Sequence, residues 1–256
     1  MTTALITGAS SGIGAVYADR LAARGLDLVL VARAADKLEE RAARLRQAYA
    51  VAVEVLPADL TEPTQLAQVE ARLGGAPIGL LVNNAGANLP GTFDTADAAD
   101  LDWLIRLNVT APTRLARAAI PGMVARGEGA IVNIGSVVGL APDIFPDTYS
   151  ATKSFLLTLS QALATQFGPK GIYVQAVLPA ATRTDIWARS GRNVDDLPAV
   201  MEVEDLVDAA LNGFDRREPV SIPVLPDAAQ WEAFEAARRA MLPGFSHAKP
   251  AARYAS

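Results

Sequence analysis

The stretch from Ala4 to Arg24, ALITGASSGIGAVYADRLAAR, joins a short apolar run to a segment of helical period through a glycine-rich turn. Glycine permits tight turns and a close approach of the backbone to a ligand. The start of a helix presents free N–H groups and a partial positive charge. The order strand, turn, helix therefore predicts a site for the pyrophosphate of a nucleotide. Its candidate contacts are Gly8, Ser10, Ser11, Gly12, Ile13 and Gly14.

The glycine spacing in this turn is G-x3-G-x-G, which differs from the common dinucleotide fingerprint G-x-G-x-x-G. Taken alone, it is equally compatible with an ordinary structural turn. Its position after the first strand favours the nucleotide site.

The same alternation continues along the chain. Apolar runs such as LDLVLVA, VAVEVL, IGLLVNN, GAIVNIG and IYVQAVLP alternate with segments of helical period near 11–24, 35–50, 100–126 and 148–167. Continuous Val/Ile/Leu strands separated by helices are typical of a parallel sheet that is covered on both faces. We find no repeat or low-complexity linker, so the pattern predicts one α/β domain over 1–256, Rossmann-like and doubly wound, with helices on both faces.

The composition limits the range of partners and compartments. The 256 residues are 51% hydrophobic and 20% charged, with a net charge of -5 and no basic run, so binding to nucleic acid or to a membrane is not expected. There is no cysteine, so no oxidising compartment is required. The N-terminus does not resemble a signal peptide, and no run of about 20 apolar residues predicts a membrane span. We therefore expect a cytoplasmic protein.

The stretch YSATK places Tyr149 and Lys153 four residues apart. On a helix these positions share one face, so an ammonium group would lie beside the phenol. A free tyrosine has a pKa of about 10, and a phenol that exchanges protons near neutral pH needs positive charge nearby. Ser136 ends a predicted strand and could join the pair from the sheet. For an arbitrary helix, a solvated Tyr/Lys pair is the alternative.

Four motifs in this order, TGASSGIG (7–14), NNAG (83–86), NIGSVVG with Ser136, and YSATK (149–153), resemble the short-chain dehydrogenase/reductase family of NAD(P)-dependent oxidoreductases. The resemblance implies hydride transfer between C4 of a nicotinamide and a carbonyl or secondary alcohol. It also implies that Tyr149 is the general acid/base, that Lys153 lowers its pKa, that Ser136 orients the substrate oxygen, and that Asn108 holds a water relay. For Asn108 alone, a local kink or helix cap before Pro112 is the alternative.

The resemblance also implies further cofactor contacts. It assigns them to Asp59, Asn84, Ala85, Gly86, Tyr149, Lys153, Pro179, Thr182 and Thr184. For Asp59, a carboxylate in a helix N-cap region is the alternative, and both roles could be true together. The family usually has Pro-Gly where this chain has Pro179-Ala180, and the restricted φ of alanine predicts a stiffer or shifted loop there.

The end of the second predicted strand distinguishes NADP(H) from NAD(H). An acidic residue there would bind the adenosine ribose and repel a 2′-phosphate. This chain has Ala32 and Arg33 instead, and an arginine can pair with a phosphate. NADP(H) is therefore favoured and NAD(H) is possible. An exposed arginine at a helix entrance is the alternative for Arg33.

Residues expected to border the substrate are mostly apolar: Leu89, Leu140, Phe145, Ile186 and Trp187. They favour a small carbonyl or alcohol with an apolar body, although Arg183 and Arg189 leave an acidic substrate possible. The irregular segment at about 184–205, centred on 186–201, is predicted to be a substrate lid. The only histidine, His247, has no neighbouring donors that would indicate a metal site.

Two other functions remain open. One is an NAD-dependent alcohol dehydrogenase, because the reaction is reversible. The other is a nucleotide-binding regulator without turnover, which the intact set of Asn108, Ser136, Tyr149 and Lys153 disfavours. By resemblance, we expect a homodimer or homotetramer that associates through 100–126 and 148–167.

Overall fold

The computed structural model describes residues 3–189 and 193–254, and its chain divides after Pro223 into two compact units. The larger unit contains the sheet and every predicted site residue. The smaller unit contains α9 (Ala228–Ala240) and the short helices η5 (Leu242–Ser246) and η6 (Ala252–Tyr254). The larger unit is described first.

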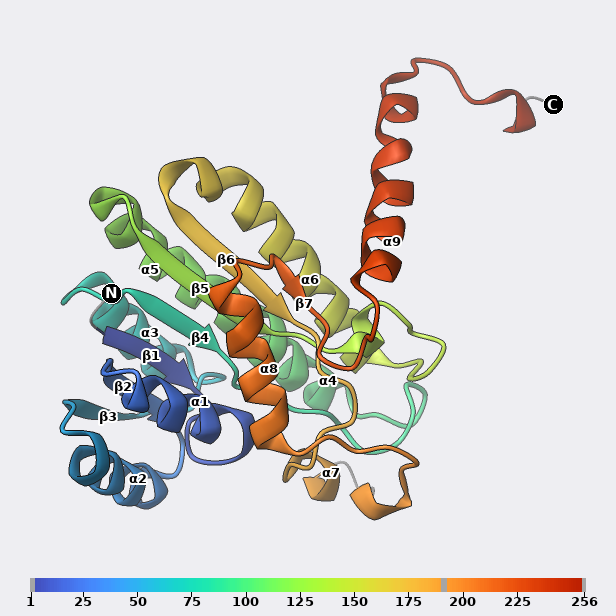
Figure 1. Cartoon of the computed structure of the whole chain (residues 1–256). Helices are drawn as coiled ribbons and strands as arrows, with labels where there is room; N and C mark the ends of the chain where they lie inside the picture. Colours follow the sequence, from blue (N-terminus) through green and yellow to red (C-terminus); the bar gives the residue numbers. More distant parts are fainter. Residues whose placement is uncertain (1–2, 190–192, 255–256) are drawn as a thin grey trace. The chain divides into compact units, whose positions relative to one another are not determined.

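Seven strands form one sheet in the order β3-β2-β1-β4-β5-β6-β7, and every pairing is parallel (Figure 1). The order reverses at β1, which lies between β2 and β4, and in such sheets ligands bind at the carboxyl ends of the strands beside this point. The predicted doubly wound α/β fold is confirmed. The strands are β1 (Thr3–Thr7), β2 (Asp27–Ala32), β3 (Val53–Pro57), β4 (Leu80–Asn83), β5 (Gly129–Ile134), β6 (Ile172–Val177) and β7 (Val220–Ser221).

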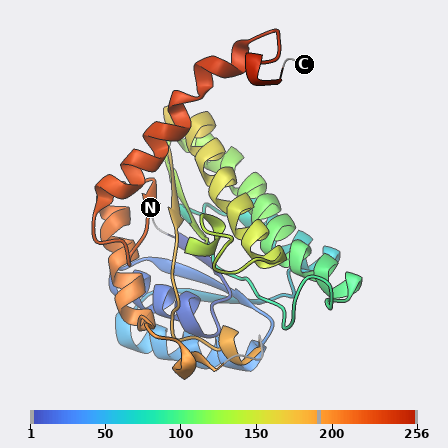
Figure 2. The ribbon, with the colours of Figure 1, turned by 90° about the vertical axis from the view of Figure 1, so that its right-hand side faces the viewer.

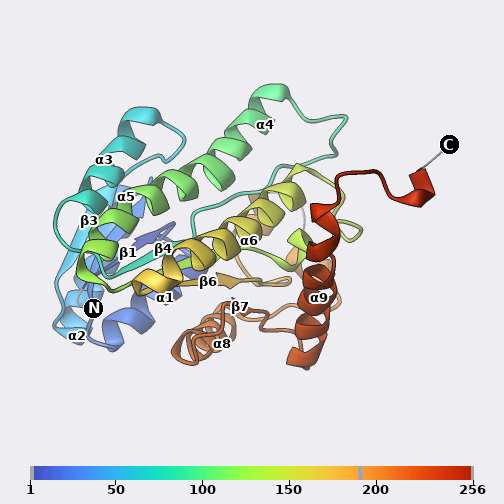
Figure 3. The ribbon, with the colours of Figure 1, turned by 90° about the horizontal axis from the view of Figure 1, so that it is seen from above.

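Helices cover both faces of the sheet, as Figures 2 and 3 show. One buried cluster contains apolar side chains from α1 (Gly12–Ala23), α2 (Ala35–Tyr49) and α8 (Val203–Asp215). A second cluster lies on the other face, with side chains from α3 (Pro63–Gly74), α5 (Ala111–Arg126) and α6 (Thr148–Phe167). Alternate residues of β1 enter the two clusters, Ala4 and Ile6 the first and Leu5 the second. This explains why the strands are apolar throughout.

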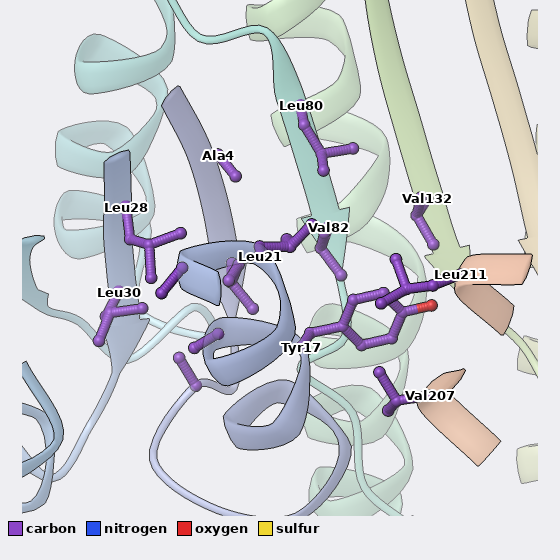
Figure 4. Close-up of a cluster of buried hydrophobic side chains, with 14 of the residues drawn as sticks. Ala4, Tyr17, Leu21, Leu28, Leu30, Leu80, Val82, Val132, Val207 and Leu211 are labelled. Carbon is purple, nitrogen blue, oxygen red and sulfur yellow. The ribbon is translucent and has the colours of Figure 1, made fainter. Parts of the chain in front are cut away.

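Figure 4 shows the first cluster, in which Tyr17 of α1 points toward Val207 and Leu211 of α8. Tyr17 is 1% exposed, and burial raises the pKa of its phenol. Leu21, one turn further along α1, packs in the same cluster. Because α1 is fixed in this way, its N-terminus and the glycine-rich turn are held at the carboxyl edge of the sheet.

One predicted helix proved to be three segments. The sequence predicts a single helix over 100–126, whereas the structure has α4 (Ala98–Ile105), a π-helical turn (Arg106–Thr110) and α5. Pro112 has no N–H to donate to the carbonyl of residue 108, four positions earlier, so the regular hydrogen-bond ladder cannot continue there. The wider turn contains Asn108. Single π-turns of this kind often occur at functional sites.

Candidate active site

The glycine-rich turn lies against the NNAG stretch after β4. Asn84 Nδ2 donates hydrogen bonds to the carbonyls of Thr7 (2.9 Å) and Gly8 (3.3 Å), and the Thr7 hydroxyl accepts from the backbone N–H groups of Asn84 and Ala85, both at 3.0 Å. Gly8 has φ +67°, and a Cβ there would lie 2.7 Å from Asn84 Nδ2. A Cβ on Gly14 would lie 2.5 Å from the Gly8 carbonyl oxygen. Both positions therefore require glycine.

Three of the predicted catalytic residues meet where β5 ends and α6 begins. Ser136 lies two residues after the end of β5 and is buried, and it is hydrogen-bonded to Tyr149 of α6. The Lys153 ammonium lies one helical turn further on, with Nζ 5.4 Å from the centre of the Tyr149 ring. Nζ donates a hydrogen bond of 2.9 Å to the carbonyl of Ile134. The helical spacing of Tyr149 and Lys153 thus places both side chains beside a strand end.

Burial dominates the electrostatics of this group. It raises the pKa of the Tyr149 phenol to about 12, and the hydrogen bond with Ser136 acts in the opposite direction. Burial also lowers the pKa of the Lys153 ammonium to about 8. At pH 7 the lysine therefore carries its charge in a buried position. At the same pH the Tyr149 phenol keeps its proton, so a protonated phenol lies beside a charged ammonium group.

Asn108 reaches the same region from the π-helical turn. Its side-chain amide forms two hydrogen bonds with the backbone of Ala87, donating to the carbonyl at 2.9 Å and accepting from the N–H at 3.0 Å. It also donates to the Thr152 hydroxyl at 3.1 Å. A Cβ on Gly86 would lie 3.3 Å from Asn108 Oδ1 and 3.5 Å from Lys153 Nζ. Asn108 therefore ties the segment after β4 to α6.

The ends of β2 and β3 bring together Arg33 and Asp59, with Nη1 and Oδ2 3.9 Å apart. Asp59 Oδ1 accepts hydrogen bonds from the Thr61 N–H (2.9 Å) and hydroxyl (2.7 Å). The N-cap of α3 is Glu62, so Asp59 shapes the turn before the helix rather than capping it. The Arg33 side chain is 60% exposed and available to a ligand.

The loop after β6 closes the site from the remaining side. The buried Pro179 carbonyl accepts a hydrogen bond from the Ser136 hydroxyl at 3.2 Å. Thr184 approaches the glycine-rich turn, because a Cβ on Gly12 (φ +54°) would lie 3.3 Å from its methyl carbon. Thr182 is buried and donates to the Ala180 carbonyl. Ala180 is not among the described residues with positive φ, so this loop uses a backbone conformation open to alanine.

The predicted lid begins in this loop. Thr182 forms a parallel bridge with Met201, and its carbonyl accepts a hydrogen bond from the Trp187 indole at 2.7 Å. Arg183 binds Asp195 (2.7 Å) and Glu202 (3.0 Å). Part of the predicted lid, 190–192, and the side chain of Arg189 lie outside the described residues. The remainder contains α7 (Ile186–Arg189) and the short helix η4 (Val194–Asp196).

Sequence reasoning missed several groups that hold the site together. The Thr7 hydroxyl fixes the NNAG stretch, Thr152 binds Asn108, and the Ile134 carbonyl receives the Lys153 ammonium. A threonine that ends an otherwise apolar strand is a signal that could have indicated Thr7. A backbone carbonyl leaves no signal in the sequence.

Within residues 3–189 and 193–254, no cluster of three or more His, Asp or Glu side chains is arranged to bind a metal ion. No helix there has the length and apolarity needed to span a membrane.

Comparisons with known proteins place these features in one family. The family model for short chain dehydrogenases matches residues 2–195. The chain is 36% identical over 200 residues to the very-long-chain 3-oxoacyl-CoA reductase of Bos taurus. That match includes 77% of this chain but only 64% of the bovine protein, so the chain spans less than two thirds of this relative's length.

Solved structures are similar over the whole chain. A short-chain dehydrogenase from Sphingobium yanoikuyae in complex with NADPH is 57% identical, with a TM-score of 0.98 and coverage of 100% of both chains. The bulky-bulky ketone specific alcohol dehydrogenase from Comamonas testosteroni is 50% identical, with a TM-score of 0.93 over 100% of this chain and 99% of that one. The motifs, the fold and these relatives agree, and the chain belongs to the short-chain dehydrogenase/reductase family of oxidoreductases.

Proposed function

We propose that this protein is an NADP(H)-dependent oxidoreductase that interconverts a ketone and a secondary alcohol with a largely apolar body. The observation that carries the proposal is the meeting of Ser136, Tyr149 and Lys153 at the ends of β5 and α6. The similarity to an NADPH complex and to a ketone-specific alcohol dehydrogenase supports the cofactor and the substrate class.

The residues present fit a dinucleotide. Gly8 and Gly14 leave no room for a Cβ, so the backbone of the turn is bare where α1 begins, and a helix N-terminus attracts phosphate. In our proposal, Ser10, Ser11, Gly12 and Ile13 complete this cradle. Asn84, Ala85 and Gly86, together with Asp59, Pro179, Thr182 and Thr184, line the remainder of the cofactor site. Arg33 would bind the 2′-phosphate that distinguishes NADP(H) from NAD(H).

Each catalytic side chain has a separate task in this proposal. The bound cofactor supplies the hydride in reduction and accepts it in oxidation. Tyr149 donates its phenolic proton to the carbonyl oxygen in reduction and takes it back in oxidation. Ser136 donates a hydrogen bond that orients the same oxygen. The Lys153 ammonium stabilises the phenolate that remains on Tyr149, and Asn108 positions the water that returns a proton to the site.

The pKa of Tyr149 decides how much this arrangement must contribute. Burial is the main cause that raises the pKa of the phenol to about 12, against the opposing hydrogen bond with Ser136. At neutral pH the phenol is protonated but is a weak acid, so efficient proton transfer in either direction requires additional positive charge beside it. The buried ammonium of Lys153 is the charge that this chain supplies.

The substrate preference is supported by the apolar residues near the site. Leu140 and Phe145 precede α6, and the Phe145 ring meets the Tyr149 ring edge-on at 6.0 Å. We propose that they, with Leu89, Ile186 and Trp187, contact the apolar parts of the substrate. A ketone with two large substituents is the first substrate to test, because it is named for the Comamonas testosteroni relative.

The deciding experiment is Tyr149→Phe, assayed by NADPH oxidation with a panel of bulky ketones. We expect turnover to fall at least about 100-fold while NADPH binding, measured by nicotinamide fluorescence, is retained. Tyr49→Phe, on the exposed surface of α2, is the matched control and should have wild-type turnover. Near wild-type turnover of Tyr149→Phe would contradict the proposed role.

The alternatives predict different results in the same assay. A nucleotide-binding regulator would bind NADPH but would not oxidise it with any ketone of the panel. An NAD-dependent alcohol dehydrogenase would prefer NAD over NADP with the corresponding alcohols. We further propose a cytoplasmic location, as the composition leads us to expect. From the family resemblance we propose a homodimer or homotetramer that associates through the region of α4 and α5 and through α6.

A further inference from the structure

A buried chain of polar side chains crosses the face of the sheet that α5 and α6 cover (Figure 3). Asn83 and Asn133 are register partners on β4 and β5. On each strand the residue two positions earlier, Leu81 or Ile131, packs in the second apolar cluster. Because side chains alternate along a strand, both asparagines point toward the same helices. They are 4% and 0% exposed, so two amides lie within an apolar layer.

The hydrogen bonds of this chain run in one direction. The Ser160 hydroxyl donates its proton to the Leu156 carbonyl at 2.7 Å, so toward the strand it can only accept. Asn133 Nδ2 donates to it at 2.8 Å, and Asn133 Oδ1 accepts from Asn83 Nδ2 at 2.9 Å. Asn83 Nδ2 also donates to the Pro112 carbonyl of α5 at 3.4 Å. The chain therefore connects α5, β4, β5 and α6, and the orientation of the Asn133 amide is fixed.

The end of β5 holds α6 at two points through this chain. Asn133 binds Ser160, and the carbonyl of the next residue, Ile134, accepts the hydrogen bond from Lys153. Lys153, Leu156 and Ser160 follow one another at intervals of three and four residues, so they lie on one face of α6, and all three are buried. Two consecutive strand residues thus bind side chains that are two helical turns apart.

We propose that Asn133 is a positioning residue, which fixes α6 on β5 so that the Lys153 ammonium stays beside the Tyr149 phenol. Apolar side chains could fill the same layer, but apolar contacts have no preferred direction. A buried hydrogen-bond chain specifies one position of the helix on the strand. Asn133 touches neither of the two reacting side chains in this role and acts through Ser160 and the body of α6.

The inference rests on the proposed function, because it concerns the distance between the ammonium and the phenol. Lys153 Nζ lies 5.4 Å from the centre of the Tyr149 ring. The attraction between an ammonium and a phenolate weakens as their separation grows. A displaced α6 would therefore stabilise the phenolate less, and the pKa of Tyr149 would rise.

Ser160→Ala tests the role at a distance from the reacting groups. It removes the acceptor of Asn133 Nδ2 and leaves that donor buried without this partner. Thr165→Ala is the matched control, because the Thr165 hydroxyl makes the same bond to a carbonyl four residues earlier, at 2.9 Å, on the exposed side of α6. The concentration of competent sites in each protein is measured by NADPH titration, followed by nicotinamide fluorescence, so that unfolded protein does not enter the rates.

The readout is the pH dependence of alcohol oxidation at saturating NADP⁺, a direction in which the phenol must first lose its proton. We expect the apparent pKa of kcat/KM for the alcohol to rise by about 0.5 to 1 in Ser160→Ala. At pH 7, below that pKa, kcat/KM per competent site should fall about 3- to 10-fold, since the phenolate fraction falls tenfold for each unit. Thr165→Ala should keep the wild-type profile.

Two further variants separate positioning from packing. Ser160→Cys has nearly the same size and keeps a weak sulfur acceptor, so its apparent pKa should lie between those of the wild type and Ser160→Ala. If Ser160→Ala yields no folded protein, Ser160→Cys takes its place in the comparison with Thr165→Ala. The double variant Asn133→Ala, Ser160→Ala should shift the profile no further than Asn133→Ala alone, because both residues act through one hydrogen bond.

Three results would overturn the positioning role. The first is a wild-type pH profile in Ser160→Ala. The second is a loss of competent sites without a shift of the profile, which would show that the hydrogen bond only stabilises the fold. The third is additive shifts for Asn133→Ala and Ser160→Ala. Tyr149→Phe reports on the proposed function separately: if it loses turnover while Ser160→Ala keeps the wild-type profile, only the positioning role fails.

Discussion

The buried ammonium of Lys153 should make stability depend on pH in a predictable way. Burial lowers the pKa of Lys153 from 10.5 to about 8 in the folded protein. Between these values the folded protein has released a proton that the unfolded chain still holds. Because the unfolded chain then binds more protons, the free energy of unfolding rises with pH across this window. Below pH 8 the buried charge reduces stability.

The size of the effect follows from the shift. A difference of about 2.5 pH units at 1.36 kcal/mol each corresponds to about 3 kcal/mol in total. Relative to pH 7, the contribution of Lys153 to stability should be about 1 kcal/mol more favourable at pH 9 and about 2 to 3 kcal/mol more favourable at pH 10. Lys153→Met removes the titrating group at similar length. It also leaves the Ile134 carbonyl without its 2.9 Å partner, which costs about 1 kcal/mol or more at every pH.

We therefore expect Lys153→Met to be more stable than the wild type at pH 7 and less stable at pH 10. The measurement is urea unfolding of the cofactor-free wild type and variant at pH 7, 8, 9 and 10, followed by tryptophan fluorescence. The difference in free energy of unfolding between the two proteins should change by about 2 to 3 kcal/mol across this range. Lys37→Met, on the exposed face of α2, is the matched control and should give a constant difference.

Parallel pH profiles for the wild type and Lys153→Met would refute this reasoning. They would mean that Lys153 titrates near its ordinary pKa in the folded protein. A difference that changes in the opposite direction would mean that the pKa is raised by a nearby carboxylate or phenolate. Titration of Tyr149, whose folded pKa of about 12 exceeds its ordinary value, adds an opposite slope only above pH 10.

Three further results are expected. In thermal unfolding, Gly8→Ala should destabilise the protein by more than Gly25→Ala. Both glycines have positive φ, but only a Cβ on Gly8 would meet other atoms. Equal losses of stability would show that backbone strain alone matters. Arg33→Ala should lower kcat/KM for NADPH about 10-fold and leave kcat/KM for NADH nearly unchanged. An equal loss with both cofactors would contradict the proposed contact between Arg33 and the 2′-phosphate. Hydrogen exchange at 193–205 should slow when NADPH and a ketone bind, whereas unchanged exchange would show that this part of the predicted lid does not close.

The sequence alone determined the fold class, and it named the residues of the candidate site, whose roles stay predictions. Apolar strands that alternate with helical segments can bury both faces only in a covered parallel sheet, so the architecture followed from local patterns. The helix over Thr148–Phe167 was predicted at its observed bounds, and its i, i+4 spacing placed Tyr149 and Lys153 on one face. These inferences succeeded because periodicity within one segment directly encodes which side of that segment is buried.

Other features could be learned only from the tertiary structure. The π-helical turn at Asn108 depends on which backbone groups near Pro112 form hydrogen bonds. Helix propensities of single residues do not predict those hydrogen bonds. The Thr7 hydroxyl meets Asn84 across 77 positions of the sequence because β1 pairs with β4.

Contacts between distant segments also decide the shape of the surface near the site and the pKa of Lys153. A shallow groove is lined by Phe93 together with Val138, Pro142 and Ala151, which come together only when the strands are ordered. The lowered pKa of Lys153 follows from burial beside the Ile134 carbonyl. Sequence patterns describe one element at a time, whereas contacts between distant segments, and the dielectric environment that they create, exist only after the elements have packed.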